Sequence, residues 1–285
     1  GPRALKAQVN SSGNIYNTAV GSSAGTAVTT GILNTLIGGL AGDALTDADE
    51  NVAVGYGALT SDTLGSKSVA IGQLALSAQN FTTATNSYNT AVGSNAGQGV
   101  TTGTNNTLIG GLAGDAITTG GANVAVGTQA LSTNQTGGNS TAIGYQALFT
   151  QNTSGAVYNT AVGNAAGFSI TTGVQNTLIG GLAGDALTDA DNNVAVGTLS
   201  LSAETNNNGN TAIGAEALKS QNVGGGGDAR NTAVGFAAGT SVTTGIKNTL
   251  IGGRSGDALN DADSNVAVGE SALSSDTLGS GSVAI

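Results

Sequence analysis

The chain has 285 residues, of which 48 are Gly, only one is Pro, and none is Cys, His, Met or Trp. Charged residues make up 8% of it, against roughly 25% in an average soluble domain, and the formal net charge is −10 with only 7 Lys+Arg. This composition excludes disulfides, thiolate or imidazole metal sites and His- or Cys-based nucleophiles, and it makes nucleic acid and anionic membranes poor partners.

A five-residue segment, first seen as Asn17-Thr-Ala-Val-Gly21, recurs along the whole chain. Its sixteen copies begin at positions 17, 34, 51, 68, 89, 106, 123, 140, 159, 176, 193, 210, 231, 248, 265 and 282. The spacing is 17 residues, except after every fourth copy, where it is 21, 19 and 21. Fixed self-similarity of this kind is typical of a repeat protein whose units bury their apolar faces by stacking. We call each unit a rung, its first five residues the pentad, and the pentad residues positions one to five.

The longer gaps group the rungs in fours. They divide the chain into a partial rung at 1–16 that ends a preceding super-repeat, super-repeats at 17–88, 89–158 and 159–230, and a truncated one at 231–285, all within one continuous solenoid. Because the chain begins and ends inside a rung, we expect it to be a window on a longer periodic protein. Gly1-Pro2 is either native or a scar of protease cleavage.

The pentads predict short strands. Position two is Thr or Val, position three Ala or Leu, and position four always Val or Ile, so β-branched residues alternate with a residue on the opposite face. No apolar period near 3.6 residues supports helices. We therefore predict an all-β, parallel β-solenoid of about sixteen seventeen-residue rungs that rises about 4.8 Å per rung and is about 75–80 Å long.

The longest apolar runs are only a few residues, so we expect no membrane insertion in this segment. Small or apolar residues on both pentad faces indicate burial on both sides, which favours a parallel homotrimer. A monomeric solenoid with an Asn/Thr/Ser surface is the alternative.

Position one predicts a ladder of stacked amides. In thirteen of the sixteen rungs it is Asn, and in the other three it is Ser. Stacked about 4.8 Å apart, such amides can bond along the column and to turn backbone groups. The members are Asn17, Asn34, Asn51, Asn89, Asn106, Asn123, Asn159, Asn176, Asn193, Asn210, Asn231, Asn248 and Asn265.

An exchange of apolar volume supports one common core. Where the ninth residue of a rung is Gly, as at Gly25, the residue three further on is apolar, here Val28. Where the ninth residue is Leu, as at Leu59, that later residue is polar, here Asp62. Each rung is thus predicted to fill one interior slot from either of two positions, as close packing requires.

The pentads Asn51-Val-Ala-Val-Gly55 and Ser68-Val-Ala-Ile-Gly72 resemble the head repeats of YadA-like trimeric autotransporter adhesins. The fuller rung, Asn51-Val-Ala-Val-Gly-Tyr-Gly-Ala-Leu59 followed by Thr63 and Gly65, is similar to the seventeen-residue repeats of phage tail-fibre proteins with a C-terminal intramolecular chaperone. The resemblance covers nearly the whole chain and implies left-handed parallel β-rolls wound as trimers. The rungs are longer than the adhesin head repeat, and no stalk, anchor or chaperone segment lies in this sequence.

Acidic residues recur in one loop, which is a candidate Ca²⁺ site because closely spaced aspartates suit that ion. The alternative is a solvated turn, favoured by the second super-repeat, where the loop keeps only Asp115. The candidate ligands are Asp43, Asp47, Asp49, Asp185, Asp189, Asp191, Asp257, Asp261 and Asp263. We expect no other cofactor, no catalytic residues and no enzymatic activity.

The long connections at 80–88, 152–158 and 222–230 are the most variable segments. They are either tolerated insertions or, like many loops on rigid scaffolds, binding segments, in which case the partner would be a cell-surface glycan or protein. The repetition as a whole favours a mechanical role: a rigid segment of an extracellular, cell-surface or virion fibre, in a phage tail fibre or bacterial adhesin. Ice binding and polysaccharide depolymerisation are minor alternatives, because Val interrupts the Thr column and the nine Phe+Tyr residues leave few stacking aromatics.

Overall fold

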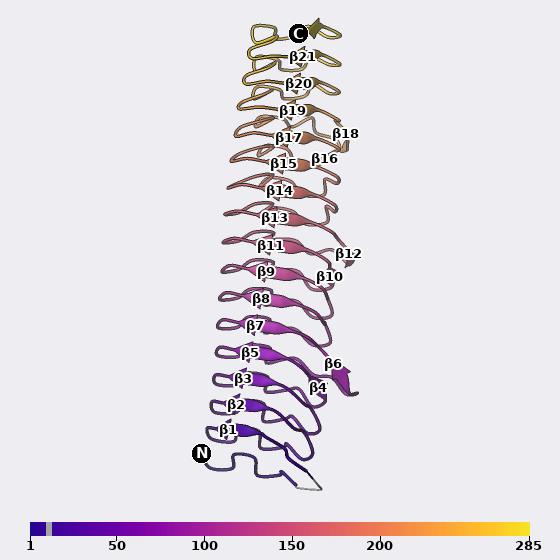
Figure 1. Cartoon of the computed structure of the whole chain (residues 1–285). Helices are drawn as coiled ribbons and strands as arrows, with labels where there is room; N and C mark the ends of the chain where they lie inside the picture. Colours follow the sequence, from indigo (N-terminus) through magenta and orange to yellow (C-terminus); the bar gives the residue numbers. More distant parts are fainter. Residues whose placement is uncertain (10–12) are drawn as a thin grey trace. The chain divides into compact units, whose positions relative to one another are not determined.

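The computed structural model describes residues 1–9 and 13–285, and within these ranges the protein is all-β, without a helix. The chain divides into two compact units, residues 1–140 with 154–156, and residues 141–153 with 157–285. Each unit is a stack of parallel β-solenoid turns (Figure 1), which confirms the predicted fold class.

In the first unit, one strand per rung builds a parallel sheet in sequence order. Its strands are β1 (Thr18–Val20), β2 (Thr35–Ile37), β3 (Val52–Val54), β5 (Val69–Ile71), β7 (Thr90–Val92), β8 (Thr107–Ile109) and β9 (Val124–Val126). Four shorter strands form two further pairs, β4 with β6 and β10 with β12. Their bounds are Gly65–Ser66, Thr85–Asn86, Gly137–Gly138 and Gly155–Ala156, in order of number.

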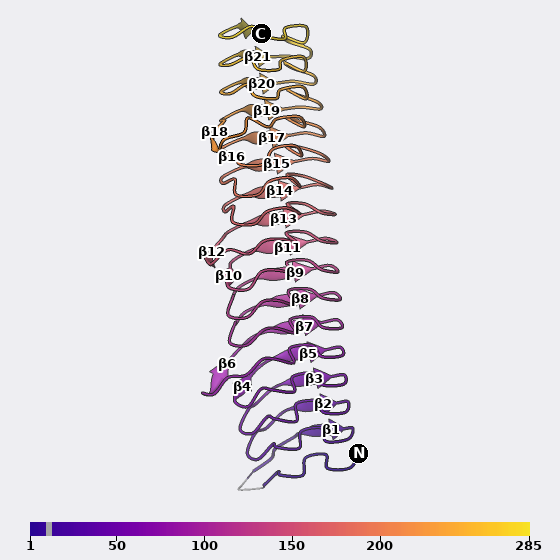
Figure 2. The same cartoon turned by 180° about the vertical axis from the view of Figure 1, so that it is seen from behind.

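The second unit repeats this arrangement. Its sheet contains β11 (Thr141–Ile143), β13 (Thr160–Val162), β14 (Thr177–Ile179), β15 (Val194–Val196), β17 (Thr211–Ile213), β19 (Thr232–Val234), β20 (Thr249–Ile251), β21 (Val266–Val268) and β22 (Val283–Ala284). The short strands β16 (Asn207–Asn208) and β18 (Gly227–Asp228) pair with each other. In Figure 2, which turns the view by 180°, the strands of each unit again follow one another in a single column.

The register between rungs matches pentad positions. Thr35 pairs with Val52, Leu36 with Ala53, and Ile37 with Val54. Position three is buried throughout both sheets, except in the first and last strands, whereas positions two and four are only partly covered. Position three therefore points into the solenoid, and positions two and four form what we call the outer sheet face.

Position five needs glycine for two reasons. Gly38 has φ +136°, and a Cβ there would lie 2.4 Å from the carbonyl oxygen of Gly55 in the next rung. A side chain would be strained by the backbone conformation and would separate the two rungs. This close approach ends each strand and lets the chain turn.

The interior slot is filled from two positions, as the sequence predicts. At Gly42 a Cβ would lie 2.8 Å from side-chain carbons of both Leu36 and Leu45, so a larger residue does not fit. In the alternative rungs Leu59 takes the space and adopts φ 53°, an uncommon conformation for a branched side chain. The polar partner of this exchange, Asp62, is itself fully buried.

Candidate functional site

The Asn column follows one hydrogen-bond pattern in the regular rungs. The backbone N–H of Asn123 donates to Oδ1 of Asn106 at 3.1 Å, and Nδ2 of Asn106 donates to the carbonyl of Gly120 at 3.0 Å. The same two bonds recur around Asn34, where Asn51 N–H donates to Oδ1 at 3.0 Å and Nδ2 donates to the Ala48 carbonyl at 2.8 Å. Each buried amide therefore joins its own rung to the next one and satisfies a turn carbonyl.

The pattern changes at the super-repeat junctions, where fully buried polar side chains form a network that the sequence analysis missed. Asp62 Oδ1 accepts the backbone N–H groups of Gly65 and Phe81, both at 3.0 Å. Gln79 Nε2 donates to Asp62 Oδ2 at 2.6 Å, and Asn89 Nδ2 donates to Gln79 Oε1 at 2.9 Å. A carboxylate, a glutamine and the next ladder asparagine thus form a chain through the junction.

The other junctions repeat the glutamine and asparagine bonds of this motif, and Glu204 takes the place of Asp62 at one of them. Gln221 Nε2 donates to Glu204 Oε2 at 3.0 Å, and Asn231 Nδ2 donates to Gln221 Oε1 at 2.9 Å. In the second super-repeat Asn159 Nδ2 donates to Gln151 Oε1 at 2.9 Å. The signal was present in the sequence, since Gln79, Gln151 and Gln221 each lie seven residues after a fourth-rung pentad glycine.

The structure does not bring together the aspartates of the candidate Ca²⁺ loop. Asp43 Oδ1 accepts the Thr60 hydroxyl at 2.5 Å, Asp47 Oδ1 accepts the Thr30 hydroxyl at 2.5 Å, and Asp49 Oδ1 accepts the Ile32 N–H at 2.8 Å. Each carboxylate therefore bonds to a different residue of a neighbouring rung.

The copies of this loop behave in the same way, with Asp191 bonded to Val174 N–H and Asp263 to Ile246 N–H, both at 2.8 Å. Asp189 accepts the adjacent Thr188 hydroxyl at 3.1 Å, and Asp261 is exposed. Within residues 1–9 and 13–285 no group of three or more acidic side chains is placed to hold a metal ion.

Asp185 and Asp257 differ from the equivalent Asp43, because their Oδ1 atoms are buried without a hydrogen-bond partner. Burial raises the pKa of Asp185 above its ordinary value by desolvating the carboxylate, and its own backbone N–H opposes this with a smaller lowering.

The long connections carry mostly exposed residues at their tips. In 80–88 the tip residues Thr82, Thr83 and Ala84 are exposed, while Phe81 and Ser87 anchor the connection inside. In 152–158 and 222–230 the buried anchors are Val157 and Ala229. The short strands β6, β12 and β18 lie in these connections, so each loop is held to an earlier rung by backbone pairing.

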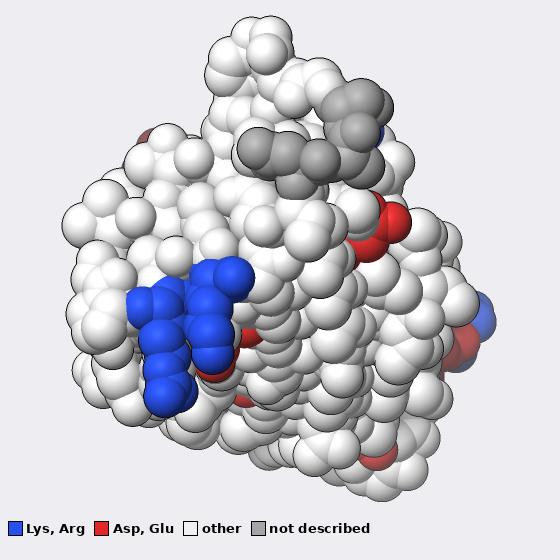
Figure 3. Space-filling model, turned by 90° about the horizontal axis from the view of Figure 1, so that it is seen from below, with Lys and Arg blue, Asp and Glu red and all other residues white. Residues whose placement is uncertain are grey.

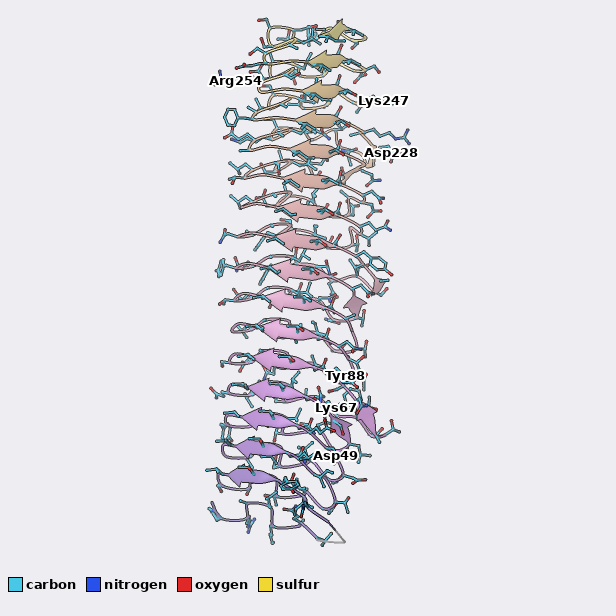
Figure 4. All side chains as sticks on the ribbon, in the orientation of Figure 1. Asp49, Lys67, Tyr88, Asp228, Lys247 and Arg254 are labelled. Carbon is cyan, nitrogen blue, oxygen red and sulfur yellow. The ribbon has the colours of Figure 1, made fainter. Side chains whose placement is uncertain are left out.

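Aromatic residues sit next to the outer sheet face. Tyr16, Tyr88 and Tyr158 precede the first pentad of a super-repeat and are 51–68% exposed. Lys67 lies before the pentad of the preceding rung, and its Nζ is 5.5 Å from the centroid of the Tyr88 ring (Figure 4). These tyrosines are therefore surface groups.

The outer sheet face is an apolar feature that repeats in every rung. Ile at position four is 37–40% exposed in β2, β5, β8, β11, β14, β17 and β20. Positions two and four carry no charged residue in any rung. The face seen in Figure 3 is also mostly uncharged.

The part of the chain that the structure describes contains no pocket. It also contains no helix with the length and hydropathy needed to cross a membrane. No known protein-family model matches the sequence, and no curated protein matches it. The features that remain as candidate functional surfaces are the outer sheet face and the three loops.

Proposed function

We propose that the chain is a rigid structural segment of an extracellular or virion fibre, such as a phage tail fibre or bacterial surface adhesin, that spaces or presents receptor-binding parts. The observation that carries this proposal is the uniformity of the rungs, since the sheet register and the amide bonds recur every 17 residues. Repetition supplies length and stiffness, whereas a catalytic site needs a unique constellation of groups. The segment is accordingly proposed to be no enzyme.

The proposed fibre is a parallel homotrimer. Its support is the outer sheet face, where a regular row of Ile and Val stays half-exposed among the residues that the structure describes. Exposed apolar surface that continues over many rungs marks an interaction site. Three parallel copies around one axis would cover it in every rung with the same contact.

Removing one super-repeat tests the structural role. Deletion of residues 89–158 removes four rungs and is expected to shorten the particle by about 19 Å, at about 4.8 Å per rung, while its melting temperature changes by only a few degrees. Small-angle scattering and electron microscopy of the purified chain measure the length. An unchanged length, or a compact particle, would contradict the proposal.

Sedimentation equilibrium of the purified chain gives the number of chains per particle, and one chain per particle would reject the homotrimer.

The competing candidate is direct binding of a cell-surface glycan or protein by the loops. It is supported by the exposed tips of 80–88, 152–158 and 222–230 and by their recurrence once per super-repeat, which would let weak contacts add. Replacing all three loops with the 17-residue spacing of the regular rungs separates the two functions. A fibre that keeps its length and stability but attaches to its host cell only at background level would establish the loops as the binding segments.

A further inference from the structure

The two ends of each outer strand carry different side chains. We call the residue immediately before the pentad the leading edge and the residue immediately after the pentad glycine the trailing edge. Both flank the half-exposed positions two and four of the same rung. The edges therefore border the outer sheet face on either side.

The trailing edge of the second rung in every super-repeat is a glycine that the chain itself does not require. None of these four glycines has φ in the left-handed region. A Cβ at Gly181 or Gly253 would meet no heavy atom within 4 Å, and at Gly111 the nearest atom is 4.0 Å away. Only Gly39 has a side chain nearby, the Tyr56 ring at 3.5 Å. A recurring glycine without a backbone or packing reason indicates close approach by another molecule.

The leading edge of these same rungs carries a longer, exposed side chain. The four pairs are Leu33 with Gly39, Asn105 with Gly111, Gln175 with Gly181, and Lys247 with Gly253. The first rungs show a related division: Tyr16 occurs with Ser22, Tyr88 with Ser94, Tyr158 with Asn164, and Arg230 with Phe236. In the first and second rungs, a bulky group on the leading edge thus occurs with a small or chemically matched group on the trailing edge.

The two edges of a rung do not touch each other in one chain. They are six residues apart on a nearly extended segment, which places them on the order of 15–20 Å from each other. Figure 4 shows this separation in the second unit, where Lys247 lies on one side of the strand column and Arg254, next to the trailing-edge Gly253, lies on the other. Edge contacts within the chain run between rungs, as for Lys67 and Tyr88. The matched side chains on the two edges of one rung therefore cannot contact each other within a single chain.

We propose that a second copy of this chain, parallel and in register, packs with its leading edge against the trailing edge of the same rung, so that Gln175 of one copy covers Gly181 of the next. This inference rests on the proposed homotrimer and specifies its contact. In a cyclic trimer whose axis is parallel to the stack, the leading edge of each copy meets the trailing edge of the next copy. The third copy then closes the ring.

The area and charge of the face suit this occupant. A fully exposed aliphatic side chain offers on the order of 100 Å². At the exposure of the Ile residues, which exceeds that of position two, the two positions give at most roughly 80 Å² per rung. Ten or more rungs are then needed to reach the roughly 800 Å² that each partner contributes to a stable interface. At the edge positions themselves the pairing opposes no like charges, since Glu50, Lys67, Arg230, Lys247 and Glu270 face Tyr56, Gln73, Phe236, Gly253 and Ser264. One like-charge approach adjoins them, between Lys247 of one copy and the exposed Arg254 that follows Gly253 in the next.

Because the chain has no cysteine, engineered disulfides can map the contact. The double variant Gln175→Cys with Gly181→Cys is expected to form disulfides between copies on mild oxidation and to run as a covalent trimer without reductant. In the matched control, Gln175→Cys with Gly253→Cys, the second site lies four rungs away, about 19 Å by the rung rise and beyond the roughly 7 Å limit between bridged Cα atoms. The control is expected to stay uncrosslinked.

Sedimentation of the same samples distinguishes failure of the edge pairing from failure of the homotrimer. Trimers that form no disulfide in the first variant, or form it equally in the control, overturn the edge pairing and leave the homotrimer standing. Single chains overturn both the edge pairing and the homotrimer.

A second comparison is independent of oxidation: Gly181→Trp is expected to weaken association at least tenfold with unchanged circular dichroism. Gly227→Trp, at an exposed loop glycine with equally open space, is expected to leave association unchanged. Unchanged association in Gly181→Trp would contradict the inference.

Discussion

Regular rungs and super-repeat junctions satisfy their buried polar groups with different side chains. In a regular rung, Asn106 reaches the carbonyl of Gly120, fourteen residues later, and the N–H of the next ladder residue. At a junction the residue fourteen positions after Ser68 is Thr82, in the exposed part of a loop, and Gln79 with Asp62 supplies the bonds instead. The apolar core continues through both, since Ala70 and Ala91 are fully buried on either side. The comparison shows that polar pairing, rather than core volume, decides where the 17-residue spacing can be interrupted.

Loss of a ladder amide in a regular rung is expected to have the largest effect on stability. Asn106→Ala removes the acceptor of the Asn123 N–H and the donor to the Gly120 carbonyl, both in a fully buried site. Two unsatisfied buried groups are expected to lower the free energy of unfolding by about 3–5 kcal/mol. Chemical denaturation measures this. Thr102→Ala, at an exposed position of the preceding rung, is the control and should cost less than about 0.5 kcal/mol; equal losses in the two variants would contradict the ladder's role.

A junction should respond to loss of its carboxylate. Asp62→Ala leaves the N–H groups of Gly65 and Phe81 and one Gln79 donor without their acceptor. We expect a loss of about 2–3 kcal/mol, smaller than in the regular rung because the adjoining loop can relax toward solvent. Asp62→Asn should lose less, since the second super-repeat has the amide Asn134 at this place. Exposed Ser61→Ala serves as the control, and a loss in Asp62→Ala no larger than the control's would show that the network is not needed.

The third junction differs from the first two because its ladder residue is an asparagine. Before two of the long connections position one is Ser, but before 222–230 it is Asn210, whose Nδ2 is buried without a partner. The residue fourteen positions later, Gly224, lies in the exposed loop. Asn210→Ser removes this unsatisfied donor but also the Oδ1 that accepts the Asn231 N–H at 3.1 Å, so the free energy of unfolding is expected to change by less than about 1 kcal/mol. Asn193→Ser, in a regular rung, loses only satisfied bonds and is expected to lower it by about 2–3 kcal/mol. Equal losses in the two variants would reject the explanation.

The smallest effect concerns pH. Because burial raises the folded-state pKa of Asp185, the folded chain binds more protons than the unfolded chain between the two pKa values, and stability falls as pH rises through that window. Asp185→Asn is expected to remove this slope and to gain less than about 0.5 kcal/mol at neutral pH, since the side chain is partly solvated. Denaturation across the acidic range, with exposed Asp189→Asn as control, measures it. A slope that persists in Asp185→Asn would assign the dependence to other groups.

Much of the architecture was predictable because each rung repeats local information. The alternation around Leu36 placed position three inside, and the exchange between Gly42 and Leu59 identified one shared interior slot. The candidate sites were less predictable. The spacing of Asp43, Asp47 and Asp49 suggested a shared cation, but the turn directs the three carboxylates to separate neighbours. Sequence proximity does not determine side-chain direction in a turn.

The sequence by itself determined the period, the strands and the inward face, since all three follow from residue type and spacing along a single rung. Only the tertiary structure decided which groups meet across rungs: Asp62 with Gln79, Glu204 with Gln221, and the Nδ2 of Asn210 with no acceptor. The members of each pair are 17 positions apart, and their contacts depend on the path of the connection between rungs. That path is set by stacking and backbone pairing, which no single rung encodes.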